Sequence, residues 1–153
     1  MRAARTVRVR PARENDARAI ASLMAQLGYR VPPEEVAKRL RERSARREVF
    51  VAVDEAVASD PIGWAAVSTD DPFVEGFGAE LEGLVVAECA RSHGVGACLI
   101  EAAEVWARER GCAQMRVRSN VVRKRALGFY QRHGYSAIKA QNRLIKPLGT
   151  TCE

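Results

Sequence analysis

The sequence has no long apolar run and no cysteine motif. A membrane-spanning helix needs roughly 18 consecutive apolar residues, and no stretch of the 153 residues provides them. The basic N-terminal stretch lacks the apolar core of a secretory signal. The four cysteines form neither a CxxC pair nor a Cys/His pair at zinc spacing. We therefore expect a cytoplasmic protein with free thiols, no metal site and no membrane partner.

Aromatic residues are also scarce, at 6%, and acidic residues are outnumbered, which leaves a net charge of +6. A basic chain suits a nucleic-acid partner or an anionic ligand, although it also arises from the compositional habit of a genome. The arginine-rich stretches 37–47 and 115–125 keep a basic nucleic-acid-binding protein as one alternative. The low aromatic content and the lack of a helix-turn-helix or RNP pattern make nucleic acid an unlikely partner. The length favours one domain, residues 1–153.

The first half of the chain changes from strand to helix and back. Apolar and polar residues alternate at the start, as in a half-buried strand, and apolar residues then recur at helical spacing after Asn15 or Asp16, either of which suits an N-cap. Gly28 stops this helix, and Pro32 and Pro33 open the next. The predicted elements are a strand at 6–11, helices at 15–28 and 32–45, and a hairpin of strands at 48–55 and 62–69.

The second half repeats the pattern of strand followed by helix. In the strand predicted at 78–87, Leu84 and Val86 are expected on the same face as Glu80 and Glu82, because side chains alternate along a strand. The order of elements predicts an α/β fold with a mixed sheet. The remaining predicted elements are a helix from 94 to about 110, a strand at 113–119, a short helix at 123–133 and one or two strands within 135–148.

Gly94 and Gly96 lie one residue apart at the start of the third predicted helix. A helix N-terminus exposes unpaired N–H groups that attract phosphates, and glycine lets the backbone approach such a group closely. The alternative is that the glycines only make a tight turn. A dinucleotide-binding fingerprint fails because Leu99 stands where a third glycine is needed, and the GK[ST] of a phosphate-binding Walker loop is absent.

Three motifs in order resemble the GNAT (general amine N-acetyltransferase) superfamily. Residues 91–96 read Arg-Ser-His-Gly-Val-Gly and resemble its pyrophosphate loop, [Q/R]-x-x-G-x-[G/A]. LVV at 84–86 resembles the end of the family's fourth strand, and ALGFYQRHGY at 126–135 resembles its A-x-x-[FL]-Y-x-x-x-G-[FY] segment. The resemblance implies a GNAT-like acyl-CoA N-acyltransferase fold, with a mostly antiparallel sheet splayed between strands four and five and flanked by about four helices.

The resemblance also implies acetyl-CoA as cosubstrate. Its pyrophosphate would lie on the turn into the third predicted helix, and its pantetheine arm would follow the open edge of the fourth strand. The amide of Val86 would then face the thioester oxygen, and Asn120 would either reach the pantetheine arm or cap a helix. The cofactor-binding residues implied are Leu84, Val85, Val86, Arg91, Ser92, His93, Gly94, Val95, Gly96, Ala97, Asn120 and Tyr130.

An acetyl transfer needs a base and an acid, since the amine must lose a proton and the CoA thiolate must gain one. By resemblance, Glu80 or Glu82 is the candidate base, with water as the alternative, and Tyr130 is the candidate acid. Both glutamates also suit an ordinary solvated strand, and Tyr130 suits simple packing.

The resemblance implies direct transfer of the acetyl group to a primary amine of a small molecule or peptide, in a possible homodimer. Another alternative is a GNAT domain that binds acetyl-CoA without catalysis. The acceptor itself is not encoded in a motif. Five acidic residues suggest a lining for a cationic amine: Glu34, Glu35, Asp70, Asp71 and Glu75.

Overall fold

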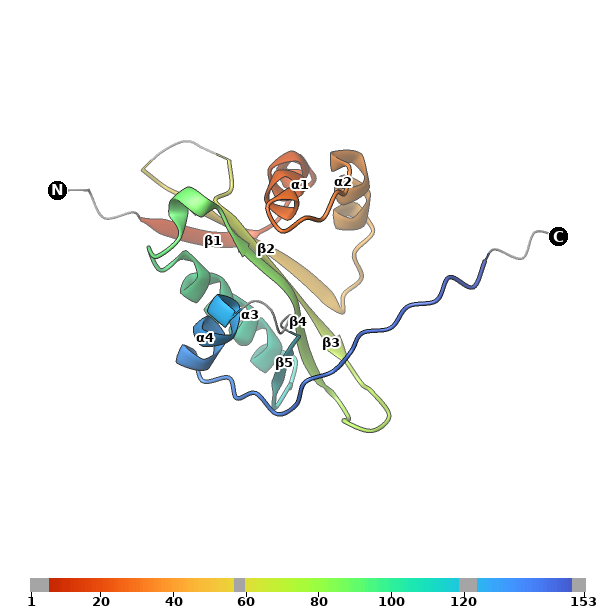
Figure 1. Cartoon of the computed structure of the whole chain (residues 1–153). Coiled ribbons are helices and arrows are strands. Elements are labelled where there is room, and N and C mark those ends of the chain that lie inside the picture. Colours follow the sequence, from red (N-terminus) through yellow and green to blue (C-terminus); the bar gives the residue numbers. More distant parts are fainter. Residues whose placement is uncertain (1–5, 57–59, 119–123, 150–153) are drawn as a thin grey trace. The chain divides into compact units, whose positions relative to one another are not determined.

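The computed structural model describes residues 6–56, 60–118 and 124–149. The chain divides into two compact units, residues 1–118 and residues 119–153, and each is described by itself. The larger unit contains one five-stranded sheet with the order β1-β2-β3-β4-β5. Neighbouring strands are antiparallel except β4 and β5, which are parallel. This arrangement confirms the predicted mixed, mostly antiparallel sheet (Figure 1).

The helices and strands of the larger unit follow the predicted order. The strands are β1 (Val7–Pro11), β2 (Arg47–Asp54), β3 (Gly63–Asp70), β4 (Gly78–Val86) and β5 (Met115–Val117). The α-helices are α1 (Ala17–Ala25), α2 (Pro33–Arg41) and α3 (Val95–Glu109), and the short 3-10 turns are η1 (Glu14–Asp16) and η2 (Glu88–Ala90).

Helix α2 ends at Arg41, before the predicted limit at residue 45. The guanidinium of Arg43 donates to the Leu40 carbonyl at 3.0 Å and to the Ala12 carbonyl at 3.1 Å. A side-chain donor thus satisfies a carbonyl that would otherwise need a further helical turn. The chain is thereby directed into β2.

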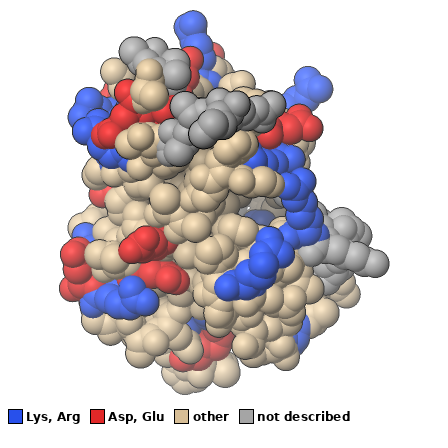
Figure 2. Space-filling model, turned by 90° about the vertical axis from the view of Figure 1, so that its left-hand side faces the viewer, with Lys and Arg blue, Asp and Glu red and all other residues tan. Residues whose placement is uncertain are grey.

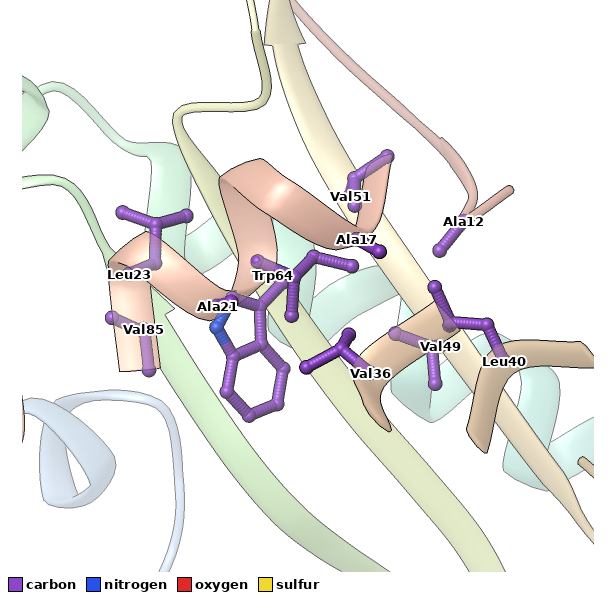
Figure 3. Packing of buried hydrophobic residues seen from close by; sticks show 11 residues of the cluster. Ala12, Ala17, Ala21, Leu23, Val36, Leu40, Val49, Val51, Trp64 and Val85 are labelled. Carbon is purple, nitrogen blue, oxygen red and sulfur yellow. The ribbon is translucent and has the colours of Figure 1, made fainter. Parts of the chain in front are cut away.

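Helices α1 and α2 cover one face of the sheet with an apolar cluster. Their side chains pack against Val51, Trp64 and Val85, which are cross-strand partners in β2, β3 and β4 (Figure 3). Helix α3 covers the opposite face, where Leu99 lies 3.1 Å from the position of a Cβ built on Gly63. The residues on this second face include Ala65 and Val67, both fully buried.

The face under α1 and α2 becomes polar at one end. Two rows along from Val51, Trp64 and Val85, the cross-strand partners are Arg47, Ser68 and Glu80. We call this second set the polar row. Because cross-strand partners share a face and side chains alternate, the polar row continues the same face as the apolar cluster.

The start of α1 is fixed by a buried ion pair. Asp16 stands at the N-cap position, as predicted, but it makes no side-chain bond to the helix. Its carboxylate instead accepts two bonds from the Arg10 guanidinium, at 2.8 and 2.9 Å, and one from the Arg13 amide at 2.8 Å. Burial alone would raise the pKa of Asp16, but these bonds and the nearby positive charges outweigh it and hold the pKa below its usual value.

The smaller unit contains α4 (Lys124–Arg132), which matches the predicted helix at 123–133. Gly134 follows it with φ of 90°, and the Tyr135 amide bonds back to the Tyr130 carbonyl at 3.1 Å. The expectation of one or two strands within 135–148 is wrong, because this segment has no strand in the described chain. A strand exists only where a neighbouring strand takes up its backbone hydrogen bonds, and alternation in the sequence does not supply that neighbour.

Candidate active site

The strands β4 and β5 pair over a short distance and then separate. Their three paired positions end at Leu81 opposite Val117. Strand β4 continues to Val86, so residues 82–86 have no partner on that side in the described chain. This observation confirms the predicted splay between the fourth and fifth strands. It leaves an open backbone edge within the sheet.

A β-bulge at Glu82 marks the point of separation. Gly83 is opposite Ala66 and Leu81 is opposite Val67, so Glu82 has no partner on β3. A bulge adds one residue to a strand and places two consecutive side chains on one side. The regular alternation along β4 is broken here.

Because of the bulge, Glu80 and Glu82 do not lie on the same face as Leu84 and Val86, which is where the regular alternation would place them. Glu80 is opposite Ser68, whereas Leu84 is opposite Ala65. Ser68 and Ala65 are an odd number of residues apart on β3, so they point to opposite faces. The expectation that the glutamates share the face of Leu84 and Val86 is therefore wrong. Glu80 faces the side covered by α1 and α2.

The amide of Val86 points to the open edge of β4. The neighbouring amide of Ala87 donates to the Ile62 carbonyl on the β3 side, at 2.7 Å. Successive amides along a strand point to opposite edges. The Val86 N–H is thus directed away from β3, which is the direction that an oxyanion-binding role requires.

The chain then turns into α3 through a left-handed step at Gly94. Its φ is 79°, and a Cβ built there would meet no atom within 4 Å, so the backbone conformation rather than space requires glycine. Ser92 has φ of 67°, an unusual value for a residue with a side chain. The left-handed conformation costs such a residue about 1 kcal/mol.

The amides at the start of α3 are available to a ligand. The first amide bonded into the helix is that of Cys98, which donates to the Gly94 carbonyl at 3.1 Å. In the described chain, the amides of Val95, Gly96 and Ala97 have no acceptor. Unpaired N–H groups at a helix start, with the positive end of the helix dipole, suit a phosphate.

The side chains of Arg91 and His93 lie at the same turn. The Nε of Arg91 donates to the Val86 carbonyl at 3.4 Å, and this contact connects the end of β4 to the turn. The Nδ1 of His93 donates to the Arg91 carbonyl at 2.8 Å, and the residue is exposed. Arg91 therefore lies between the open strand edge and the bare amides of α3.

The two candidate bases differ in how they are held. Glu82 accepts two bonds from the Arg47 guanidinium, at 2.7 and 2.9 Å. Glu80 forms a looser pair with Arg118 at 3.3 Å, and 76% of the Arg118 side chain is exposed. Two hydrogen bonds hold the Arg47 guanidinium on the Glu82 carboxylate. Arg118, the partner of Glu80, is mostly exposed to solvent.

A polar cavity of about 330 Å³ opens beside both glutamates, over the polar row. Of the five acidic residues expected to line an acceptor site, only Asp70 belongs to it, whereas Glu35 pairs with Arg39 and Glu75 pairs with Arg116. The cavity is lined by Ser44, Arg46, Arg47, Ser68, Thr69, Asp70, Glu80 and Glu82.

Arg46 and Arg47 were not predicted from the sequence as residues that line this cavity. Arg46 and Arg47 belong to a basic stretch that reads as a solvated face, and 35 residues separate Arg47 from Glu82. Only the register of β2, β3 and β4 brings them together. Ser68 likewise has no motif around it and is identified by its place in the polar row.

Tyr130 lies in α4, within the smaller unit. Its ring packs against Phe129 at 5.3 Å and Tyr135 at 5.8 Å between centroids, both edge to face. Burial raises the pKa of the Tyr130 hydroxyl above its ordinary value, so the phenol stays protonated at neutral pH. Asn120 lies outside the described residues, and its predicted role stays a prediction.

The described residues contain no cluster of potential metal-binding side chains. No group of three or more His, Cys, Asp or Glu side chains there is placed to hold an ion. In the same part of the chain, no helix has the length and apolar character needed to span a membrane.

Sequence comparison connects the chain to acetyltransferases. The acetyltransferase (GNAT) family matches residues 16–135. Aminoglycoside N(6')-acetyltransferase type 1 of Klebsiella aerogenes is 33% identical over 119 residues, which cover 74% of this chain and 76% of that protein. The residues matched by the family include β4, the turn at Gly94 and α4.

Two solved structures have the same fold. The aminoglycoside antibiotic 6'-N-acetyltransferase AAC(6')-Ih from Acinetobacter baumannii is 19% identical, with a TM-score of 0.79 over 94% of this chain and 100% of that one. AAC(6')-Iy in complex with the bisubstrate analogue CoA-S-monomethyl-acetylneamine is 21% identical, with a TM-score of 0.80 over 93% and 99%. These similarities confirm the expected fold.

Proposed function

Because this chain belongs to the GNAT family of acetyltransferases, we propose that it moves the acetyl group of acetyl-CoA directly to a primary amine of a small molecule or peptide. The chain is an acetyl-CoA-dependent N-acetyltransferase. The proposal concerns the chemical class of the amine that receives the acetyl group. The observation that carries the proposal is the open edge of β4, which leads directly to the bare amides of α3.

In this proposal the backbone does most of the cosubstrate binding. The amides of Val95, Gly96 and Ala97 bind the pyrophosphate, and the open edge of β4 pairs with the pantetheine arm as an added strand would. The Val86 N–H donates to the thioester oxygen, where negative charge develops as the amine attacks. Acetyl-CoA supplies the activated acetyl group.

Glu80 is the preferred base over Glu82. An ammonium must lose its proton before it attacks, and the base must be able to accept that proton. Glu82 is engaged by two charge-assisted bonds from Arg47, whereas Glu80 shares the cavity and, among the described residues, is paired with the exposed Arg118. Because Glu80 and Val86 are six positions apart on β4, Glu80 takes the proton through a chain of bridging waters.

Tyr130 is the proposed acid for the departing CoA thiolate. Its raised pKa keeps the hydroxyl protonated at the pH at which the thiolate leaves. The sequence around it, ALGFYQRHGY, is the segment that resembles the family's acid-bearing helix. Its placement beside the thioester is a part of the proposal.

The test measures release of CoA thiol from acetyl-CoA over a panel of primary amines. Glu80→Gln is expected to lower kcat about a hundredfold, whereas the matched variant Glu82→Gln retains most of it, since general base catalysis contributes about 10²–10⁴. Tyr130→Phe is expected to lower kcat with little change in the affinity for CoA. Equal activity of all three variants and the native chain would overturn the assigned roles. Absence of CoA binding would overturn the function.

The charge distribution does not favour the nucleic-acid alternative. Most arginines of the stretch 37–47 are already paired with carboxylates, so fewer positive charges remain for phosphates. Figure 2 shows one face of the molecule, on which acidic side chains lie among the basic ones. The pairs in this stretch are Arg39 with Glu35, Arg41 with Glu14, Arg43 with Glu48, and Arg47 with Glu82.

A further inference from the structure

The loop between β3 and β4 exposes apolar side chains to solvent. Phe73 is fully exposed, Val74 is 92% exposed, and Phe77 is also exposed. Large apolar side chains that are grouped on a surface mark a site of interaction. We call residues 70–77 the acidic loop, because it has no basic residue and three acidic ones: Asp70, Asp71 and Glu75.

The acidic loop is held in one shape by Arg116 of β5. Its guanidinium donates to the carbonyls of Asp70 and Gly76, both at 3.4 Å, and pairs with the Glu75 carboxylate at 3.4 Å. The Gly76 amide also donates to the Pro72 carbonyl at 2.8 Å. A surface that is ordered before it binds loses less conformational entropy on association. The exposed apolar side chains therefore stand on a preformed loop.

A segment of the smaller unit has the opposite charge and also exposes apolar side chains. Every residue from 136 to 149 is exposed, and this stretch has no helix or strand (Figure 1). In the described chain, none of its amides donates to a backbone carbonyl. We call residues 136–148 the basic segment, because it has no acidic residue and three basic ones: Lys139, Arg143 and Lys146. Its large apolar side chains are 86–90% exposed: Ile138, Leu144, Ile145 and Leu148.

The acidic loop and the basic segment are complementary in charge and alike in apolar character. The loop carries three negative charges, the segment carries three positive charges, and both have large apolar side chains among them. Opposite charges bring two surfaces together and fix their register, whereas burial of apolar side chains supplies binding free energy. Both sets of apolar side chains are exposed in the single chain. A partner that carries both matching surfaces is a second copy of the chain.

We propose that two copies of this chain form a closed dimer, in which the basic segment of each copy binds the acidic loop of the other. A twofold axis makes the two contacts identical, so both loops and both segments are covered and none remains for a third copy. Asp70 belongs to the acidic loop and also lines the polar cavity. The partner's basic segment therefore lies at the rim of this cavity.

The experiment is sedimentation velocity of the full chain at protein concentrations from about 0.1 to 100 μM. The native chain is expected to be a dimer at the upper end and to dissociate on dilution. Phe73→Glu in the loop and Leu144→Glu in the segment should each raise the dissociation constant about tenfold or more, because each replaces an apolar contact with a charge. The matched control is Tyr29→Glu, since Tyr29 is an exposed aromatic residue outside both surfaces. It should dimerise as the native chain does.

A mixture of two charge-reversed variants distinguishes exchange between copies from a contact within one chain. Asp71→Lys alters only the loop and Arg143→Glu alters only the segment, so each variant alone forms two mismatched contacts. A dimer with one copy of each variant has one native contact and one contact in which both charges are reversed. The mixture is therefore expected to dimerise about tenfold more tightly than either variant alone.

Binding of CoA to each variant is the control for folding. A native chain that stays monomeric over the whole range would overturn the proposal. A dimer whose dissociation constant is unchanged in both Phe73→Glu and Leu144→Glu would do the same. A mixture that dimerises no more tightly than its components would exclude exchange between copies, and oligomers that grow beyond two copies would exclude the closed dimer.

Discussion

The two ends of the face under α1 and α2 use the same strands for different purposes. At one end Val51, Trp64 and Val85 form a row that is packed beneath the helices. At the other end the same three strands carry the polar row, which lies open to the cavity. The sheet geometry is common to both ends. The difference shows that the two helices determine where this face is buried as a core and where it stays open as a polar cavity.

Among the substitutions that test the difference between the apolar end and the polar row, replacement of Trp64 is expected to have the largest effect. The residue is buried in the apolar cluster and is only 9% exposed. Trp64→Ala is expected to lower the free energy of unfolding by about 3–5 kcal/mol through lost burial and a cavity. Ser68→Ala, in the polar row of the same strand, should change it by less than about 0.5 kcal/mol. Urea unfolding of both variants measures the contrast, and similar losses would contradict it.

Substitution of Asp16 tests how much a buried carboxylate contributes to the free energy of unfolding, in comparison with the more exposed carboxylates of the cavity. Asp16→Asn at the start of α1 removes a buried partner of Arg10 and is expected to cost about 2 kcal/mol. Because the folded-state pKa is lowered, the native contribution is present above about pH 4, the unfolded value, and is lost as pH falls through the folded value.

The measurement for Asp16 is the free energy of unfolding from pH 7 down to pH 2. The native chain should lose stability across the acid range, and Asp16→Asn should lose less of it. Parallel curves for the two proteins would contradict the stabilising role of the ion pair.

Gly83 lies opposite Ala66, between the apolar end of this face and the polar row. Its substitution tests where close packing ends along β4. A Cβ built there would lie 2.7 Å from the far edge of the Trp64 indole. Gly83→Ala is therefore expected to cost about 1–2 kcal/mol, because the indole must shift in a packed cluster. Thermal unfolding measures this cost. In the double variant with Trp64→Ala, the cost of the added methyl group should disappear.

The smallest effect is expected at the Arg47–Glu82 pair. Its side chains are 46% and 31% exposed, and exposed ion pairs contribute about 1 kcal/mol or less. Glu82→Gln should therefore change the free energy of unfolding by less than Asp16→Asn does. A loss as large as that of Asp16→Asn would show that the Arg47–Glu82 pair is a structural element of the fold and not part of a surface for a ligand.

Local patterns predicted most helices and strands and the glycine turn. Helical spacing after Asp16, the alternation before residue 12 and the glycine at position 94 all act over a few residues, so they are legible in one sequence. The predicted final strands within 135–148 failed because a strand depends on a partner that is distant in the chain.

The candidate site was predicted in part. The motif around Gly94 identified the turn, and the structure supplies the left-handed backbone and the bare amides that the motif needs. The face of the glutamates was wrong because a bulge adds one residue to the alternation, and no residue type marks it. Tyr130 and Asn120 stay predictions as site residues.

The sequence by itself determined the order of elements and the turn that presents bare amides, because these depend on backbone preferences of neighbouring residues. Only the tertiary structure decided which face Glu80 occupies and which arginines meet it. Those relations depend on the register between strands, which pairs Arg47 with Ser68 and Ser68 with Glu80 across long stretches of chain. The role of a charged residue therefore depends on the strand register, because the register decides which side chains lie beside it.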